Sequence, residues 1–410
     1  MQLRSRLTVF VDAYPRMLWL LAFGSFLNLV GLSFLWPLTT VYIHSHLGRP
    51  MTVAGVVLLL HSGSAALGQL AGGWLFDRIG ARPVMLTGLF TSALLLGLLG
   101  LFESWPLYVG VMIAFGFTAS LSFPAINALV ARAWPGGGRR AFNFLYVANN
   151  VGVALGTALG GVIADRSFAA AFLSAGAAFL LFGLFVLLLI RDRRGMEGEA
   201  TPEAAAELAA AREGREGPIP WPPLAALFVT FLMAWLIYVQ WQSAVSVHMQ
   251  AHGYQLAAYS VLWTLNGGLI VLGQPLLALL VRRLPGSAAQ IGLGILLYAA
   301  AFLILLTDDA YAVFVASMVI LTLGEMLIWP AVPAAVARLS PPSRRGTLQG
   351  LILSGATIGR MLGPLLGGLL YDHFGFATLL LVMTGGLVIP LAAIGLYART
   401  EPIEDSSARR

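Results

Sequence analysis

Two glycine-rich stretches of the chain repeat each other: GVALGTALGGVIAD, residues 152–165, and GRMLGPLLGGLLYD, residues 359–372. They share all four glycines and the final aspartate. PAINALVAR, from Pro124, recurs in the same way as PAVPAAVAR, from Pro330, and GQ at 68–69 recurs at 273–274. Since the offset is close to 206 residues in a chain of 410, the sequence predicts two similar halves. Paired helical halves with a site between them at mid-membrane are typical of transporters.

The composition is that of an integral membrane protein, because 59% of the residues are hydrophobic and 10% are charged, against about 25% charged in soluble domains. Cysteine is absent and the six histidines are scattered, which predicts no disulfide framework and no metal site. All 24 basic residues are arginine. The absence of lysine excludes a P-loop lysine and a Schiff-base lysine.

Apolar segments of about 20 residues, long enough to cross a bilayer, recur along the chain between turn or charge clusters such as DRIGARP and SPPSRRGT. The fold class predicted from them is all-α integral membrane, with twelve transmembrane helices. We place these spans at 17–40, 52–76, 84–102, 105–131, 142–164, 169–190, 223–247, 255–281, 288–306, 310–337, 347–371 and 376–397.

The arginines predict the orientation, since positively charged loops stay in the cytoplasm. With a cytoplasmic N-terminus, 21 arginines fall in cytoplasmic segments, Arg49 and Arg166 fall in outward loops, and Arg360 falls within a span. Both termini are therefore expected in the cytoplasm, in a multi-pass protein of the inner or plasma membrane. The first apolar segment is too long for a signal-peptide core, so we expect it to be retained.

A charged linker separates the two halves. Residues 191–222 carry 5 arginines and 7 acidic residues, and their helix-forming centre is either a solvated tether or a surface helix. The predicted domains are an N-terminal six-helix bundle at 1–190, the cytoplasmic linker at 191–222, a C-terminal six-helix bundle at 223–398 and a cytoplasmic tail at 399–410.

The stretch GGWLFDRIGARP, residues 72–83, forms a tight charged turn after the second span. It resembles the signature of the Major Facilitator Superfamily, G-x-L-x-D-R-x-G-x-R-[KR], with Pro83 in place of the last basic residue. The resemblance extends over spans, linker and repeats, and it implies the family's fold of two pseudo-symmetric six-helix bundles. It also implies that this motif locks the outward-open state and that its aspartate caps or pairs with a neighbouring helix end. The gating residues are then Gly73, Asp77, Arg78, Gly80 and Arg82.

A second pattern, G-x8-G-x3-G-P-x2-G-G, lies on span five in the family's drug/proton antiporter branch, where it is associated with exporters. Here span five has Thr157 at the proline position, and the complete GPLLGG lies on span eleven. Glycines four residues apart let two helices approach closely, so a packing role and a switching role both remain open. The residues are Gly152, Gly156, Gly160, Gly161, Gly359, Gly363, Pro364, Gly367 and Gly368.

One acidic residue, Glu325, and one arginine, Arg360, lie inside the predicted spans. Counted from the ends of spans ten and eleven, both stand about 20 Å above the cytoplasmic side, at 1.5 Å per residue. Successive helices are usually neighbours, so we expect the two side chains to pair. The pair is either a structural lock or a proton-coupling device in which Glu325 takes up a proton outside and releases it inside. His61, on span two, is either a second proton relay or a helix-contact histidine.

Aromatic and amide side chains on the spans that usually line a central cavity are the candidates for binding substrate. A cavity rich in aromatic rings and poor in charge suits a lipophilic molecule, cations included, although such rings also face lipid. The candidates are Asn28, Trp36, Asn127, Asn149, Asn150, Trp235, Tyr238, Trp241, Gln242, Trp263, Asn266 and Trp329.

These observations predict a secondary active transporter that works by alternating access and exports lipophilic small molecules in exchange for protons. The alternatives are a lipid or glycolipid flippase and a proton-coupled importer of a small nutrient. No enzymatic motif such as G-x-S-x-G or H-E-x-x-H is present. The expected partners are a small lipophilic substrate, protons and membrane lipids, with no nucleic acid. The expected state is a monomer, with no cofactor and with the proton gradient as the energy source.

Overall fold

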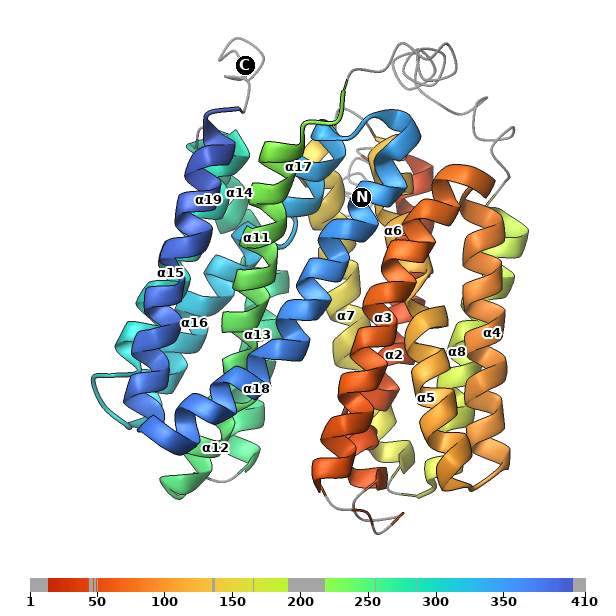
Figure 1. The fold of residues 1–410 in the computed structure, drawn as a ribbon, viewed down its shortest axis with the longest axis horizontal. Coiled ribbons are helices and arrows are strands. Elements are labelled where there is room, and N and C mark those ends of the chain that lie inside the picture. Colours follow the sequence, from red (N-terminus) through yellow and green to blue (C-terminus); the bar gives the residue numbers. More distant parts are fainter. Residues whose placement is uncertain are drawn as a thin grey trace, which may run out of the picture. The chain divides into compact units, whose positions relative to one another are not determined.

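The computed structural model describes residues 14–43, 47, 49, 51–134, 137–164, 166–190, 218–254, 256–284 and 286–400. Every regular element among them is a helix (Figure 1). The first half contains α2 (Arg16–Val41), α3 (Met51–Ile79), α4 (Ala81–Leu101), α5 (Trp105–Ser120), α6 (Ser122–Ala133), α7 (Gly138–Ala164) and α8 (Phe168–Leu189). The second half contains α11 (Trp221–Tyr238), η3 (Val239–Trp241), α12 (Ala244–Ala251), α13 (Leu256–Leu272), α14 (Gln274–Arg282), α15 (Gly286–Ile304), α16 (Tyr311–Ile328), α17 (Ala331–Leu339), η4 (Pro342–Arg344), α18 (Arg345–Gly386) and α19 (Val388–Ala398).

The chain divides into two compact units. Unit 1 comprises Met1–Pro218 and Ser340–Gly350, and unit 2 comprises Ile219–Leu339 and Leu351–Arg410. The prediction placed Ser340–Gly350 in the C-terminal bundle, whereas the structure groups this stretch with unit 1. Helix α18 therefore begins among residues of unit 1 and continues in unit 2. Most of the predicted linker lies outside the described residues.

Ten helical stretches of the described chain are long and apolar enough to cross a membrane, or up to eleven if the bent pair α13 and α14 is one span. Twelve were predicted. Two predicted spans, 347–371 and 376–397, fall inside the single stretch Pro342–Ala398. Between them the backbone of Gly375, with a φ of 78° and a ψ of 174°, is not helical, so α18 consists of two helices that meet at this kink.

Several helix ends follow directly from local residues. Gly80, with a φ of 89°, separates α3 from α4 in a conformation that other residues rarely adopt. Ser167 begins α8 as an N-cap, since its side chain accepts a hydrogen bond from Ala170 N at 3.2 Å. The predicted span 223–247 is broken by η3, and α13 and α14 meet at Gly273 with a bend of 58°.

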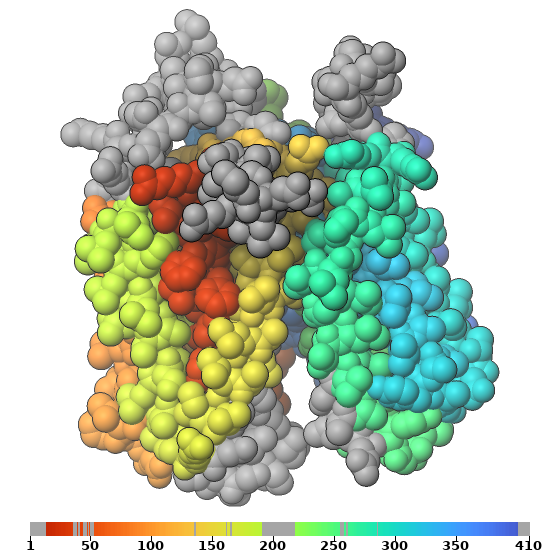
Figure 2. Space-filling view, turned by 180° about the vertical axis from the view of Figure 1, so that it is seen from behind, coloured from red at the N-terminus to blue at the C-terminus, as the bar shows by residue number. Residues whose placement is uncertain are grey.

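In unit 1 the first glycine stretch packs α7 against α2. A Cβ atom at Gly152 would overlap Phe26 O, and one at Gly156 would overlap Val30 O, so only glycine allows this separation. The surroundings of Gly161 lie outside the described residues. Helix α2 also packs against α8, and Figure 2 shows α2 (red) between α8 (yellow-green) and α7 (yellow).

In unit 2 the second glycine stretch, residues 359–372, packs α18 against α11. A Cβ atom at Gly359 would overlap Leu232 O, and one at Gly363 would meet Leu236 O at 2.7 Å. Gly368, in contrast, has open space around it. Helices α15 and α13 both pack against α16, and α19 packs against α11 and α15 (Figure 1). The repeat in the sequence thus reflects one helix-packing arrangement used once in each unit.

Large apolar side chains cover the outside of the helices. Leu188 is 76% exposed and Leu272 is 81% exposed, and many leucines and valines of both units are similarly exposed. Such an amount of exposed apolar surface is unfavourable in water and is expected where helices face lipid. The structure therefore agrees with the membrane assignment from composition.

Candidate functional site

Glu325, on α16, is a buried carboxylate that accepts hydrogen bonds from neutral side chains of α11 and α13. Its side chain is 4% exposed. Tyr238 Oη donates a hydrogen bond to Glu325 Oε2 at 3.0 Å, and Asn266 Nδ2 donates to the same oxygen at 2.9 Å. Asn266 Nδ2 also donates to Thr322 Oγ1 at 2.9 Å, so the amide is oriented by α16 as well. Helices α11 and α13 thus supply polar contacts that offset part of the desolvation cost of Glu325.

Five aromatic side chains of unit 2 gather beside this carboxylate, and we call them the aromatic cluster: Trp235, Tyr238, Trp263, Tyr298 and Trp329. Trp235 and Trp329 stack with centroids 4.6 Å apart and an interplanar angle of 4°. Tyr238 lies edge-on to both Trp263 and Trp329, and stacks with Tyr298 at 6.0 Å. The cluster therefore joins α11, α13, α15 and the break between α16 and α17. It provides aromatic rings next to a buried carboxyl group.

The predicted ion pair between Glu325 and Arg360 is wrong. Arg360 Nη2 donates instead to Thr357 Oγ1 at 3.1 Å, and its guanidinium lies 4.6 Å from the ring centroid of Trp235. Equal depth along two helices fixes the height of two side chains, but not the side of the helix from which each one points. Glu325 is oriented towards α11 and α13, where Tyr238 and Asn266 contact it. Arg360 thus contacts the aromatic cluster without contacting the carboxylate.

Two further residues predicted for the cavity lie elsewhere in unit 2. Trp241 is fully buried, and its backbone oxygen accepts a hydrogen bond from Tyr259 Oη at 2.9 Å. Gln242 is exposed. No ring contact joins Trp241 to the aromatic cluster in the described part of the chain. The reason is local, because the backbone changes from α-helix to the tighter η3 at Val239, which rotates later side chains away from the face of Trp235 and Tyr238.

The cavity candidates of unit 1 fall into separate polar contacts. Ser25 Oγ donates to Asn149 Oδ1 at 2.5 Å, and Asn150 Nδ2 donates to the carbonyl oxygen of Tyr146 at 2.9 Å. Asn28 is fully buried, and neither atom of its amide has a hydrogen-bond partner among the described residues. Asn127 on α6 is also buried. The side chain of Trp36 lies outside the described residues.

His61 occupies a contact between α3 and α5 within unit 1. Its Nδ1 lies 2.8 Å from the carbonyl oxygen of Met112, and a carbonyl only accepts, so Nδ1 carries the hydrogen of this bond. The ring stacks on Phe115 with centroids 5.9 Å apart. These contacts agree with one of the two alternatives for His61, a histidine at a contact between helices. The other alternative, a proton relay, stays a prediction.

Asp77, at the end of α3, caps the beginning of α18 within unit 1. Its Oδ1 accepts a hydrogen bond from Gly346 N at 3.0 Å, and its Oδ2 accepts from Thr347 N at 2.7 Å and from Thr347 Oγ1 at 2.6 Å. The first amides of a helix lack partners in that helix, and a negative charge is favourable there. The expectation that Asp77 caps a neighbouring helix end is confirmed. Gly73 allows the approach, since a Cβ there would overlap Gly346 O.

The two arginines of the same motif hold the surrounding turn. Arg78 lies over the ring of Trp74, 4.0 Å from its centroid. Arg82 Nη2 donates to the carbonyl oxygen of Leu187 at 2.8 Å, near the end of α8. The motif therefore ties α3 and α4 to other helices of unit 1, which is consistent with a conformational role rather than substrate binding.

Tyr298 and Thr322 were missed by the sequence reasoning, although both belong to the surroundings of Glu325. Tyr298 is the sole tyrosine of the predicted span 288–306. The close approach that brings it near depends on Gly294 and Gly324, whose added Cβ atoms would meet each other's carbonyl oxygens. The LGE triplet at 323–325 was the available signal, because glycine beside a buried acid indicates a closely packed neighbouring helix.

The fold and the site define a polytopic helical membrane protein of the transporter class, with two compact units and a buried carboxylate in one of them. The chain belongs to the Major Facilitator Superfamily, whose family description matches residues 21–293 and 286–410. It is a multi-pass membrane transporter rather than an enzyme.

Individual relatives agree with this assignment. The chain is 43% identical over 385 residues to the "Uncharacterized MFS-type transporter YttB" of Bacillus subtilis (strain 168), covering 93% of this chain and 95% of YttB. It is 24% identical over 374 residues to "Multidrug resistance protein 1" of the same strain, covering 89% and 93%. The crystal structure of the human organic anion transporter MFSD10 (TETRAN) matches with a TM-score of 0.74 at 17% identity, covering 92% of this chain and 99% of that one. This last similarity concerns the fold.

Proposed function

We propose that the protein is a secondary active transporter that exports lipophilic small molecules, cations among them, in exchange for protons by alternating access. The observation that carries the proposal is the Glu325 carboxylate, which is 4% exposed, accepts hydrogen bonds from Tyr238 and Asn266, and lies against the aromatic cluster. The drug/proton antiporter resemblance and the relative named as a multidrug resistance protein support the same substrate class.

The proposed coupling rests on the position of Glu325. It is a buried carboxylate on a helix long and apolar enough to span the membrane, where a negative charge is costly and acidic residues commonly mark proton relays. A bound proton removes that charge, and so does a bound organic cation. In the proposed cycle the two compete for the carboxylate: proton uptake from outside releases the substrate, and proton release inside restores the site.

The aromatic cluster supplies the affinity for the apolar part of the substrate. Stacked and edge-on rings bury large apolar areas, and each exposed ring face attracts a cation by about 0.5–2 kcal/mol. Trp235 and Trp263 are partly exposed, whereas Tyr238 and Tyr298 are buried. Trp329 and Arg360 cover the ring of Trp235, so Trp263 is the partly exposed ring of the cluster that a substrate reaches. Arg360, over Trp235, gives that face a positive charge that disfavours a cation directly above it.

The remaining parts of the proposal concern the membrane location of the protein, its energy source and the change between its access states. We propose an inner or plasma membrane location with both termini in the cytoplasm, a monomeric state, and the proton gradient as the sole energy source. The Asp77 cap on α18 is proposed to stabilise one of the two access states, because it is a small set of hydrogen bonds that opening of the helix end would break.

The test is transport by purified protein in proteoliposomes, with a pH gradient imposed in each direction and ethidium as the lipophilic cation. We expect Glu325→Gln to lose accumulation driven by the gradient while it still exchanges ethidium across the membrane without a gradient. Glu103→Gln, the same chemical change in the exposed connection between α4 and α5, is the matched control and keeps the gradient-driven transport. Full gradient-driven transport by Glu325→Gln would refute the coupling role. Movement of fluorescent phospholipid, without ethidium transport, would favour the flippase instead.

A further inference from the structure

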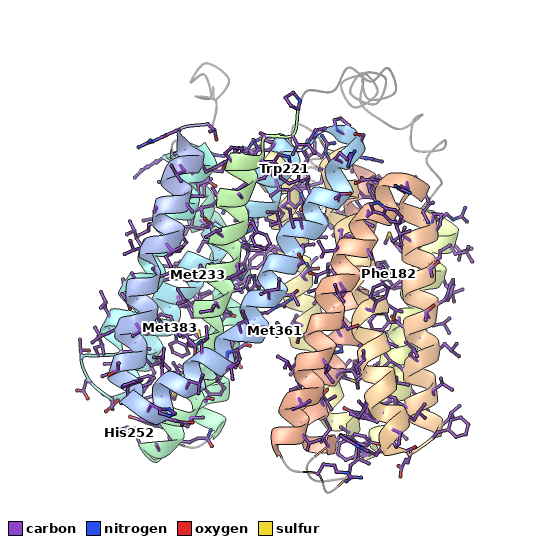
Figure 3. All side chains as sticks on the ribbon, viewed as in Figure 1. Phe182, Trp221, Met233, His252, Met361 and Met383 are labelled. Carbon is purple, nitrogen blue, oxygen red and sulfur yellow. The ribbon has the colours of Figure 1, made fainter. Side chains whose placement is uncertain are left out.

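We propose that His248, His252 and Asp309 form a binding site for Zn²⁺ at the end of unit 2 opposite Trp221. Figure 3 labels His252 and Trp221 at the two ends of this unit. The three residues are far from Glu325 in the sequence and none of them belongs to the proposed transport site. One ligand atom from each residue lies within 4.8 Å of the ligand atoms of the other two.

The backbone brings the three donors together from two elements. His248 and His252 are four residues apart, on the last turn of α12 and at its C-cap, so both rings project from one face of the helix. Asp309 lies in the connection between α15 and α16. His248 Nε2 is 2.6 Å from Asp309 Oδ1, and His252 Nε2 is 3.2 Å from Asp309 Oδ2. The scattered histidines of the sequence predicted no such group.

Second contacts fix the donors in the orientation that a metal needs. His252 Nδ1 is 2.9 Å from the carbonyl oxygen of His248, so the hydrogen sits on Nδ1 and the lone pair of the neutral ring sits on Nε2. Metal-binding histidines usually use their second nitrogen in this way. The ring of His248 stacks on Phe376 at 3.7 Å, and Tyr254 Oη donates to the carbonyl oxygen of Asp309 at 2.9 Å. The stacking contact and the hydrogen bond from Tyr254 position His248 and Asp309 and leave the atoms that would bind the metal available.

The distances suit a tetrahedral ion after a small adjustment. Zn–N and Zn–O bonds of about 2.0–2.2 Å at the tetrahedral angle separate neighbouring donors by about 3.3 Å. The His252 to Asp309 separation of 3.2 Å already matches, and the 2.6 Å separation has to open slightly. The fourth position stays available for water. Solvent reaches the site, since the side chains of His252 and Asp309 are 40% and 46% exposed.

The donor set selects the class of ion. Two imidazole nitrogens and one carboxylate suit borderline divalent ions such as Zn²⁺, whereas Ca²⁺ and Mg²⁺ prefer sites made of oxygen. Zn²⁺ would bind the lone pair of Nε2 on each ring, the nitrogen that faces Asp309 in both histidines. A bound ion would link α12 to the α15–α16 connection, and thereby tie together chain segments about 60 residues apart.

The experiment is isothermal titration of ZnCl2 into the full-length protein, purified in detergent after removal of any histidine tag. We expect one saturable site per chain. His252→Gln and Asp309→Asn should each weaken Zn²⁺ binding by at least about tenfold. Both residues are partly exposed, and thermal unfolding without Zn²⁺ verifies that each variant is folded.

Matched controls separate this site from adventitious binding. Asp308→Asn makes the same change one residue away, and His373→Gln removes an exposed histidine elsewhere in unit 2. A double change of His44 and His46 to glutamine removes the other closely spaced histidines of the sequence. All three controls should bind Zn²⁺ as the unmodified protein does. The absence of saturable binding, or equal binding by His252→Gln and Asp309→Asn, would overturn the proposal.

Discussion

Replacing Asp77 with alanine removes the carboxylate that caps α18 and leaves the rest of unit 1 in place. Asp77 accepts three hydrogen bonds, two from the backbone of Gly346 and Thr347 and one from the hydroxyl of Thr347. The two amides are in the first turn of α18, where no intrahelical carbonyl is available. We therefore expect local opening of this helix end to become easier, with little change elsewhere.

The magnitude follows from the number and kind of bonds lost. A hydrogen bond to a charged group contributes about 1.5–3 kcal/mol, and removing an N-cap costs about 0.5–2 kcal/mol. Asp77 is partly exposed, so water replaces part of what is lost. We expect a net cost of about 1.5–3 kcal/mol, which is about a 10- to 150-fold increase in the opening equilibrium. Asp77→Asn keeps one acceptor oxygen and should give an intermediate value.

Hydrogen exchange measured by mass spectrometry reads this equilibrium directly in peptides that cover residues 345–350. Asp372→Ala, the same change at an exposed position of α18, is the control and should leave those amides unaffected. Unchanged exchange at 345–350 in Asp77→Ala would refute the capping argument. Faster exchange throughout unit 1 would also contradict it, because the loss would then be global rather than local.

Two further predictions concern helix contacts. Gly363→Ala should lower the thermal unfolding midpoint, at a cost of about 1–3 kcal/mol, because the new Cβ would meet Leu236 O at 2.7 Å. Gly368→Ala has open space and should be neutral or slightly stabilising, so an equal loss in both variants would contradict the packing argument. His61→Asn keeps a donor near Met112 O and should retain gradient-driven ethidium transport in proteoliposomes. Loss of coupling with normal folding would make His61 a proton relay instead.

Much of the candidate site was accessible from the sequence. The buried acid Glu325 was found because an isolated charge in an apolar run is conspicuous, and Trp329 because it lies one helical turn from Glu325. Trp235 and Tyr238 were found because they are aromatic residues on a span that usually lines the central cavity. The hydrogen-bond partners of Glu325 were not predicted from the sequence. The position of a residue along a helix gives its depth, but not the side of the helix from which its side chain points. Donors from α11 and α13 contact the carboxylate, and Arg360 contacts Trp235.

The sequence by itself determined the apolar helices and the internal repeat, because composition and periodicity are local properties that each segment carries alone. The capping role of Asp77 was implied by the resemblance of its motif to the family signature, and the contact itself joins residues far apart in the chain. Only the tertiary structure decided which side chains meet. Tyr298 reaches the aromatic cluster through the close contact of α15 and α16, and Asp309 reaches His248 and His252 through the connection between those helices. Such side-chain contacts depend on the rotation and packing of each helix. All of the neighbouring helices together determine that rotation and packing.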